Sequence, residues 1–253
     1  MKKRSALKDR LAGIAHGLGY TVIPNWQLDT FTSAAFLRRL FLHLEIDCVI
    51  DVGANAGQYH DFLRREVGFD GLIASFEPVP HLAEALRGRA VTDSRWLINH
   101  CALGAQPGEL DFNVMAGTEF SSFLKPIGDT SFGGANRVTQ TVKTTVKTLD
   151  DVVPELRRAH GVKKIYLKLD TQGFDLEVLK GGQGALETIS ALQSEMCVKP
   201  IYEGMPRFTE VIAYLEARGF QMSGIFPNNA GHFPLLLEFD CYMIRGQDVA
   251  AIH

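Results

Sequence analysis

Short apolar runs alternate with stretches of helical spacing along most of this 253-residue chain. Such runs suit strands buried on both faces of a parallel sheet, and parallel strands need crossover connections between them. The alternation therefore predicts a doubly wound α/β sheet, in which ligands bind beyond the carboxyl ends of the strands. The expected strands span residues 48–53, 72–76, 96–103, 164–170 and 191–198, and the expected helices span 31–44, 55–66, 81–89, 148–160, 174–179 and 206–218.

Two parts of the chain depart from this alternation. Residues 109–115 and 138–146 alternate polar and apolar side chains, as half-exposed strands do. The stretch between them, 116–137, is rich in Gly, Ser, Thr and Asn and is expected to form a long loop of the functional or disordered kind. The runs 220–226 and 235–245 are expected to close the sheet as an antiparallel pair. The sheet should thus be mostly parallel, with an antiparallel last strand and an inserted β-rich segment.

Residues 1–45 are expected to form an N-terminal helical cap on a domain that spans residues 46–253. Charged residues and glycines interrupt the first apolar positions, so the segment does not match a signal peptide. We expect an amphipathic helix that docks on the domain or covers a substrate pocket, with weak contact to an anionic membrane as the alternative. No apolar run approaches the roughly 18 residues of a membrane span. The apolar positions at helical spacing are Leu7, Leu11, Ile14 and Leu18.

Composition and charge narrow the class of protein. The chain is 46% hydrophobic and carries a net charge of -3, whereas nucleic-acid binders are usually basic, so no nucleic-acid partner is expected. The four cysteines lie far apart without a CxxC pair, which argues against a zinc site or a disulfide scaffold. Buried, reduced thiols in a cytoplasmic protein are the simplest interpretation.

A glycine-containing turn follows the first predicted strand and reads Asp51-Val-Gly53-Ala-Asn55-Ala-Gly57. Its glycines let the backbone turn tightly and let a ligand approach. A dinucleotide site would have a third glycine, and the acid at the strand end suits a cation such as an amino group better than a pyrophosphate. Glu77 ends the second strand, where a carboxylate can accept hydrogen bonds from both ribose hydroxyls. S-adenosylmethionine (SAM), a nucleoside with a cationic amino-acid tail, fits this pair; an incidental acid beside a glycine-rich turn is the alternative.

Carboxylates at later strand ends are the candidates for catalysis. Methyl transfer to a hydroxyl needs an acceptor held in line and a group that removes its proton. Asp170 ends the fourth strand, where it is expected to contact the cofactor and position or deprotonate the acceptor, or else to cap the next helix. Glu195 is the second candidate and would share a divalent cation with Asp170, although a reaction without metal is favoured. His232, in the loop before the last strand, is either a base or a solvated surface residue.

Other residues are assigned to the walls of the pocket. Ser121 and Ser122 lie in the long loop, where they face the substrate or satisfy loop backbone groups. Tyr202 is expected at the cleft rim or packed against the following helix. The end of the third strand is expected at the adenine end of the cofactor, or packed in the sheet, and contributes His100, Cys101 and Ala102.

Several segments of the chain resemble the FkbM family of SAM-dependent methyltransferases. The most specific is Lys168 to Gly181, which reads Lys-Leu-Asp-Thr-Gln-Gly-Phe-Asp-Leu-Glu-Val-Leu-Lys-Gly. The turn at 49–55 matches as well, but most SAM-dependent methyltransferases share it. Further matches are Phe76-Glu77-Pro78, Ala102-Leu103-Gly104 and Thr148-Leu149-Asp150-Asp151.

The resemblance carries expectations about fold and activity. It implies a Rossmann-like class I methyltransferase sheet, SAM as cofactor, and Pro78 beside Glu77 in the cofactor site. It also implies O-methylation of hydroxyls, often on sugars of glycolipids and polysaccharides or on natural products. Two departures matter, because the family often has Glu where Gln172 stands and Asn near His100. Either departure would reflect substrate choice or details of the adenine contact, and Gln172 joins the candidate substrate residues.

Two other classes of function stay open at this point. A SAM-binding interaction or sensing module would keep the fold and the cofactor site without turnover. A nucleotide-dependent oxidoreductase would need an atypical glycine loop, and Asp51 argues against it. The expected partner is a small-molecule or glycan acceptor, and the sequence leaves a homo-oligomer open.

Overall fold

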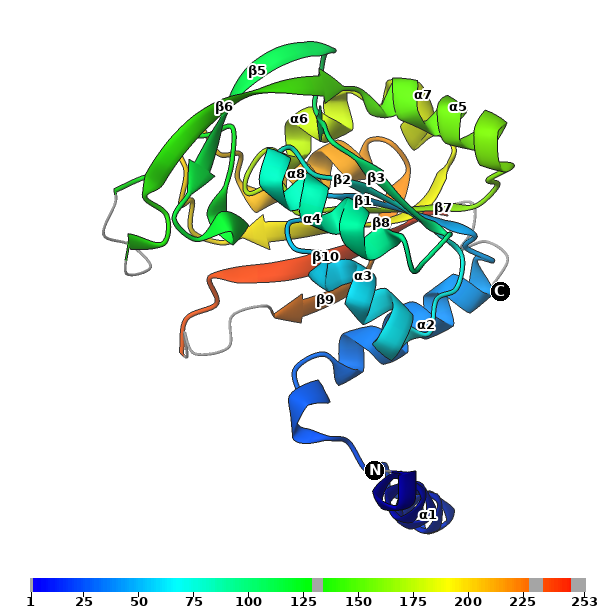
Figure 1. Ribbon diagram of the computed structural model, residues 1–253. Helices are drawn as coiled ribbons and strands as arrows, with labels where there is room; N and C mark the ends of the chain where they lie inside the picture. The colour runs from blue at the N-terminus through cyan, green and yellow to red at the C-terminus, as the bar shows by residue number, and fades with distance from the viewer. Residues whose placement is uncertain (1, 129–133, 228–233, 247–253) are drawn as a thin grey trace.

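A seven-stranded sheet forms the centre of the fold in the computed structural model, which describes residues 2–128, 134–227 and 234–246 (Figure 1). Its order is β3-β2-β1-β7-β8-β10-β9. The first five strands in this order are parallel, and β10 is antiparallel to both of its neighbours. The predicted fold class is therefore confirmed. The strands are β1 (Cys48–Val52), β2 (Leu72–Phe76), β3 (Trp96–Asn99), β7 (Ile165–Leu169), β8 (Ile189–Cys197), β9 (Phe220–Pro227) and β10 (Glu238–Arg245).

Helices cover both faces of this sheet because alternate strand residues point to opposite sides. In β1, Ile50 packs in one core with Val152 of α5, whereas Val49 packs in the other core with Leu37 of α2. Residues of α6, α7 and α8 join the first core, and α3 and α4 pack against the second. The helices are α2 (Phe31–His43), α3 (Gln58–Phe62) with a π-helical segment (Leu63–Val67), α4 (Pro80–Ala90), α5 (Leu149–His160), α6 (Asp175–Lys180), α7 (Gln183–Leu186) and α8 (Phe208–Glu216).

A second, three-stranded sheet forms the predicted insertion, in the order β4-β6-β5. It contains β4 (Ala102–Leu103), β5 (Gly108–Met115) and β6 (Val138–Lys147), and the segment after β5 includes a short 3-10 helix (Thr118–Phe120). The single strand predicted for 96–103 is wrong, because the chain leaves the large sheet after Asn99 and β4 pairs with β6 instead. Both halves of that run contain buried residues, so the apolar pattern does not reveal the break.

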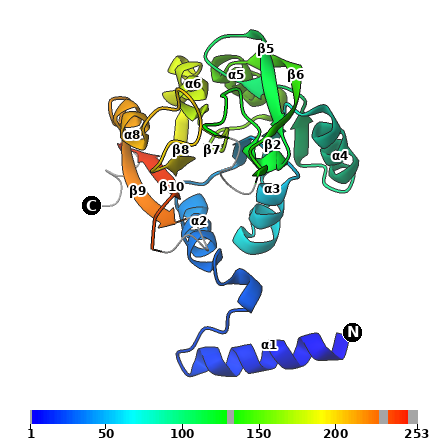
Figure 2. The same cartoon turned by 90° about the vertical axis from the view of Figure 1, so that its left-hand side faces the viewer.

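The N-terminal helix α1 (Lys2–Gly17) lies apart from the rest of the chain in two perpendicular views (Figures 1 and 2). Its side chains Leu11 and Ile14 are exposed, so the expected docking onto the domain is not observed. A segment with a 3-10 turn (Asn25–Gln27) connects α1 to α2, which does pack on the sheet through Leu37 and Phe41. Within the described ranges, no helix is long and apolar enough to cross a bilayer.

Candidate active site

A cavity of about 990 Å³ lies at the carboxyl ends of β1, β2, β7 and β8. This is where ligands bind in a doubly wound sheet. Apolar side chains of β5 and the following loop, Phe112 and Phe123, line it together with carboxylates from four strand ends. The residues predicted from sequence that line this cavity are Gly53, Asn55, Glu77, Pro78, Ala102, Ser121, Asp170, Gln172 and Glu195.

The turn after β1 is held against the ends of β2 and β7. The backbone N–H of Asn55 donates to Glu77 Oε2 at 2.7 Å, and Thr118 donates to the Asn55 amide oxygen at 2.9 Å. Gly53 has φ +83°, and a Cβ there would lie 1.9 Å from the carbonyl oxygen of Asp170. Only glycine fits such an approach, so the turn brings the ends of β1 and β7 together.

Glu77 is a buried carboxyl group in the cavity wall, 3% exposed. Its Oε1 accepts the N–H of Val79 at 2.8 Å and its Oε2 accepts that of Asn55. Burial raises the pKa of Glu77 to about 7, although these two backbone donors act in the opposite direction. Each oxygen keeps lone pairs for a further donor, so the ionised group can accept two ligand hydroxyls.

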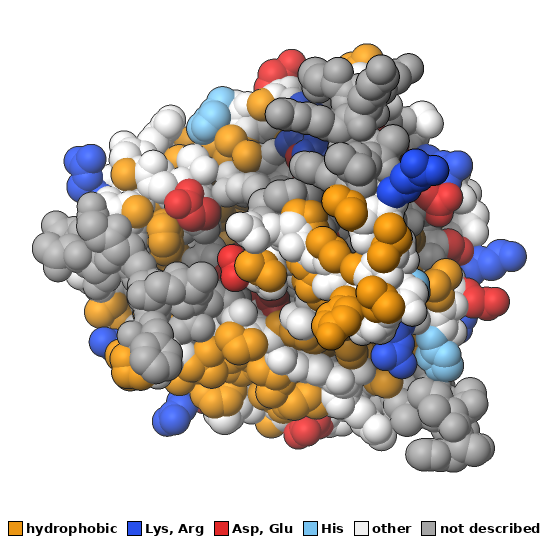
Figure 3. Space-filling model, turned by 90° about the horizontal axis from the view of Figure 1, so that it is seen from below, with side chains coloured by type: hydrophobic (Ala, Val, Ile, Leu, Met, Phe, Trp, Pro, Cys, Tyr) orange, Lys and Arg blue, Asp and Glu red, His pale blue; other side chains and the backbone are white. Residues whose placement is uncertain are grey.

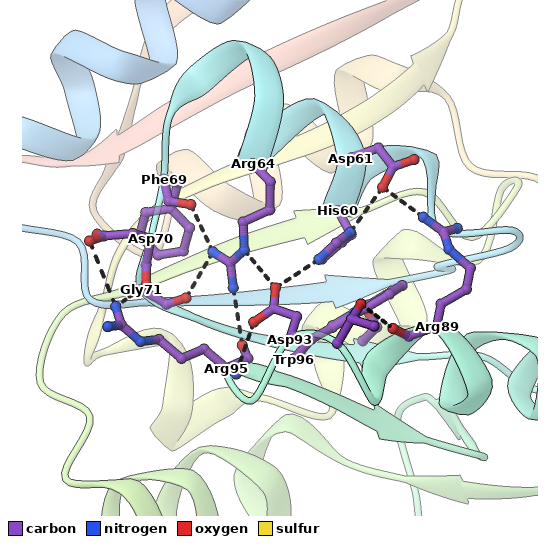
Figure 4. A network of polar contacts seen from close by, with 12 residues as sticks. His60, Asp61, Arg64, Phe69, Asp70, Gly71, Arg89, Asp93, Arg95 and Trp96 are labelled. Carbon is purple, nitrogen blue, oxygen red and sulfur yellow. Dashed lines mark hydrogen bonds and ion pairs between the residues drawn. The ribbon is translucent and has the colours of Figure 1, made fainter.

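Beneath the turn, a polar network fixes α3 to the edge of the sheet (Figure 4). Arg64 donates to Asp93 at 2.8 Å, and the ring of buried His60 lies 3.0 Å from the same Asp93 oxygen. Arg89 of α4 bonds Asp61 and also the carbonyl oxygen of Ala56 in the turn. Burial alone would raise the pKa of Asp93, but its hydrogen bonds from Arg64 and His60 hold it below the ordinary range. The network therefore positions the cavity wall, to which it contributes Asp61.

Lys168 is a buried cation at the centre of the site. Its Nζ lies 3.1 Å from Asp51 Oδ1, 3.3 Å from Asp170 Oδ2 and 3.2 Å from the carbonyl oxygen of Gly53. Burial lowers the pKa of Lys168, but the adjacent carboxylates of Asp51 and Asp170 outweigh it and raise the pKa above its ordinary value. Lys168 is thus an ammonium group that joins the turn to the end of β7, and not a base.

Asp51 itself lies behind the cavity wall. It is fully buried, and Ser75 donates to its Oδ2 at 2.9 Å. Ser75, Asp51 and Lys168 occupy one register row across β2, β1 and β7. The carboxylate therefore faces Lys168 from within the sheet, and any contact with a ligand's amino group remains a prediction.

A group of carboxylates lines the cavity beyond Asp170. Glu195 of β8 pairs in register with Asp240 of β10, and Glu238 lies two residues before Asp240. Burial and the nearby charges of Asp170 and Glu238 raise the pKa of Glu195 well above its ordinary value. Burial also raises the pKa of Asp240 to about 6. A carboxylate of raised pKa is a stronger base, which suits proton removal from a hydroxyl.

Gln172 connects this carboxylate group to the long loop. Its amide nitrogen donates to Asp170 at 3.1 Å and to Glu195 at 2.7 Å. Tyr202 donates to the Gln172 amide oxygen at 3.0 Å, and Ser122 donates to its carbonyl oxygen at 2.8 Å. Gln172 has φ +51°, a left-handed conformation that costs a non-glycine residue about 1 kcal/mol or more. Such strain persists where surrounding contacts hold it, and here those contacts orient the two carboxylates.

Several predicted residues lie outside the cavity lining. Ser122 and Tyr202 are buried and bond Gln172, so they position a lining residue and do not contact the cavity. Cys101 and Gly57 are absent from the lining, and His100 is on the surface. His232 lies outside the described residues. Within those residues, no cluster of three or more His, Cys, Asp or Glu side chains is suited to hold a metal ion.

The lining residues that escaped the sequence analysis include three charged residues of the large sheet: Lys168, Glu238 and Asp240. The sequence does mark each of them, because each is a charged residue within an apolar strand run. Such a residue is costly to bury without a partner, so it is expected to be paired or to face a cavity. The pairing that makes them informative comes from strands far apart in sequence. Local pattern alone therefore did not place them at the cavity.

Comparisons with known proteins agree with this geometry. The methyltransferase FkbM domain matches residues 51–222. Methyltransferase sdnD of Sordaria araneosa is 28% identical over 154 residues, which cover 53% of this chain and 59% of that protein. This chain therefore matches less than two thirds of that relative's length.

A solved structure shares the fold. The FkbM methyltransferase from Methylobacillus flagellatus KT superposes with a TM-score of 0.52 at 16% identity, over 79% of this chain and 44% of that one. The resemblance found in the sequence is confirmed, and with it SAM as the cofactor of the family. The chain belongs to the FkbM methyltransferase family.

Proposed function

We propose that the chain catalyses SAM-dependent O-methylation of a hydroxyl on a sugar, a glycolipid or a secondary metabolite. One observation carries this proposal. The same cavity is lined by Glu77, a carboxylate suited to accept hydrogen bonds from ribose hydroxyls, and by two potential bases, Asp170 and Glu195. The chain spans 59% of the length of sdnD and 44% of the length of the solved FkbM structure. The activity of the whole protein is therefore part of the proposal and does not follow from those relatives.

The cofactor end of the cavity fits SAM. Glu77 would accept the two ribose hydroxyls, and the turn at Gly53–Asn55 would lie against the amino-acid tail. The apolar side chains of Ala102, Phe112 and Phe123 would contact the adenine ring. When bound, SAM supplies a methyl group that the positive sulfur has already activated.

The acceptor end contains the groups that a hydroxyl needs. Asp170 or Glu195 can accept the hydroxyl proton, and Gln172 holds both carboxylates in place. Lys168 balances the charge of Asp170 without competing for the proton. Glu238 and Asp240 add negative charge to the lining, which disfavours phosphorylated acceptors.

The compartment and the acceptor class are parts of the same proposal. All four cysteines are free and buried, which suits the reducing cytoplasm. A small-molecule or glycan acceptor matches a cavity of about 990 Å³.

Transfer of a tritium-labelled methyl group from SAM tests the proposal. Neutral glycosides and polyketide alcohols are screened beside their phosphorylated counterparts, and products are analysed by NMR for O–CH₃ groups. We expect transfer to a neutral hydroxyl compound, at least about tenfold faster than to its phosphate, because of like-charge repulsion. N-methyl products, or SAM binding without transfer to any hydroxyl, would contradict it, and the second outcome would favour a sensing module.

A further inference from the structure

The N-terminal arm, residues 2–30, presents apolar side chains to solvent. Leu11, Ile14 and Leu18 are 56%, 62% and 72% exposed. Tyr20 and Val22, in the segment after α1, are exposed as well. We call these five residues the arm patch. Seen from below, where α1 lies in Figure 1, the molecule has hydrophobic side chains gathered on its surface (Figure 3).

Solvent exposure of such a group needs a reason. Single exposed apolar residues are ordinary, but several that follow one another along an arm indicate a surface that another body covers. Leu11 and Ile14 are three residues apart in α1, so they share one side of the helix, and Leu18 follows directly after its last residue. The domain does not cover that side, because these side chains are exposed in the folded chain.

Charge separates the arm from the remainder of the protein. The sequence of α1 contains Lys2, Lys3, Arg4, Lys8 and Arg10 against a single acid, Asp9. Its formal charge is thus +4, whereas the whole chain carries -3 and the remainder therefore -7. A basic segment with exposed apolar side chains is typical of segments that bind membrane surfaces, where lysine and arginine contact anionic headgroups.

We propose that the arm binds the surface of an anionic lipid bilayer, with the arm patch inserted among the headgroups and α1 lying in the plane of the interface. The charge of α1 complements such a surface. Two copies of a +4 helix repel each other, which disfavours self-association through the same patch.

The arm also joins the domain beside the cavity. Thr30, the residue before α2, lines the cavity and donates to Glu66 of the π-helical segment at 2.6 Å. A bilayer-bound arm would hold the cavity close to the lipid surface, where a lipid-linked acceptor is concentrated. The membrane contact itself does not depend on the proposed reaction.

Co-sedimentation of the full chain with vesicles, in the absence of SAM, tests the proposal. We expect binding to phosphatidylcholine vesicles that contain phosphatidylglycerol, and at least about tenfold weaker binding to pure phosphatidylcholine or at high salt. The triple variant Leu11→Gln/Ile14→Gln/Leu18→Gln should bind at least about tenfold more weakly. Lys3→Glu/Arg4→Glu/Lys8→Glu should lose the preference for anionic lipid.

A matched control replaces exposed apolar residues of the domain, outside the arm. Val91→Gln/Leu110→Gln/Val138→Gln removes similar side chains and should leave vesicle binding within about twofold of the unmodified chain. Thermal unfolding shows whether each variant is folded. The proposal is overturned if the unmodified chain binds no vesicle, or if Leu11→Gln/Ile14→Gln/Leu18→Gln binds as well as the control variant. It is also overturned if sedimentation velocity shows a dimer that the arm variant alone dissociates, since the patch would then be a contact between copies.

Discussion

Asp170→Asn is expected to lower kcat at least about 100-fold, because an amide cannot take the acceptor proton or attract the hydroxyl as a carboxylate does. Asp170 follows β7, lies in the cavity wall, and receives a hydrogen bond from Gln172. The loss should fall on turnover, since the ribose end of the cofactor is held by Glu77. We therefore expect the Kd for SAM to change by less than about threefold.

The substitution also removes one charge beside Lys168, so a structural effect must be separated from a chemical one. Asp111→Asn is the matched control, because Asp111 lies on β5 outside the cavity and pairs with exposed Lys143. Both variants are compared by thermal unfolding, SAM titration and initial rates. If the folded Asp170→Asn protein keeps full turnover, Asp170 is not the proton acceptor and Glu195 becomes the candidate.

Lys168→Met should lower the free energy of unfolding by about 3–5 kcal/mol. The ammonium group lies 3.1 Å from Oδ1 of Asp51, which is fully buried. Without it, the Asp51 carboxylate keeps Ser75 as its one side-chain hydrogen-bond donor among the described residues, and Asp170 loses an ion pair. Removing one partner of a buried pair costs more than the pair contributes, because an uncompensated charge remains.

Two further variants make this result specific. Lys180→Met removes an exposed lysine whose ion pair with Glu177 is 2.6 Å long, and it should cost less than about 1 kcal/mol. Lys168→Met/Asp51→Asn should be more stable than Lys168→Met alone, since the second change removes the buried charge. Urea unfolding measures all four proteins. Equal losses for the single and the double variant would contradict the assigned role of Lys168.

The turn after β1 and Glu77 were predictable from sequence because each directly follows a strand. Their chemistry depends on their own residue types and on the general rule that ligands bind beyond the carboxyl ends of parallel strands. The split of 96–103 into β3 and β4 was not predictable, since buried residues stand on both sides of the break at His100. Which sheet a short apolar run joins depends on its partner, and β6 lies far along the chain.

The local sequence pattern also did not predict which way the loop side chains point. Ser121 and Ser122 are adjacent, yet the first lines the cavity and the second bonds the backbone of Gln172. The sequence left Tyr202 either at the cleft rim or packed against the following helix, and it is buried, with its hydroxyl bonded to Gln172. Both residues bond Gln172: Ser122 donates to its carbonyl oxygen and Tyr202 to its side-chain amide oxygen. These contacts join residues far apart in the sequence, so local pattern does not predict them.

Calorimetric titration of SAM into the unmodified chain and into Glu77→Gln, between about pH 5 and pH 8, tests the central claim most directly. With a Glu77 pKa of about 7, the free carboxyl is protonated below that pH and must ionise to accept two hydroxyls. The unmodified chain should bind one SAM, with an affinity that rises up to about tenfold per pH unit as pH approaches 7 and then levels off.

Glu77→Gln should bind SAM about 100-fold more weakly above pH 7 and lose the pH dependence. The control Glu84→Gln changes an exposed residue of α4 and should behave as the unmodified chain does. Absence of SAM binding by the folded chain, or unchanged affinity in Glu77→Gln, would contradict the assignment of this cavity to SAM.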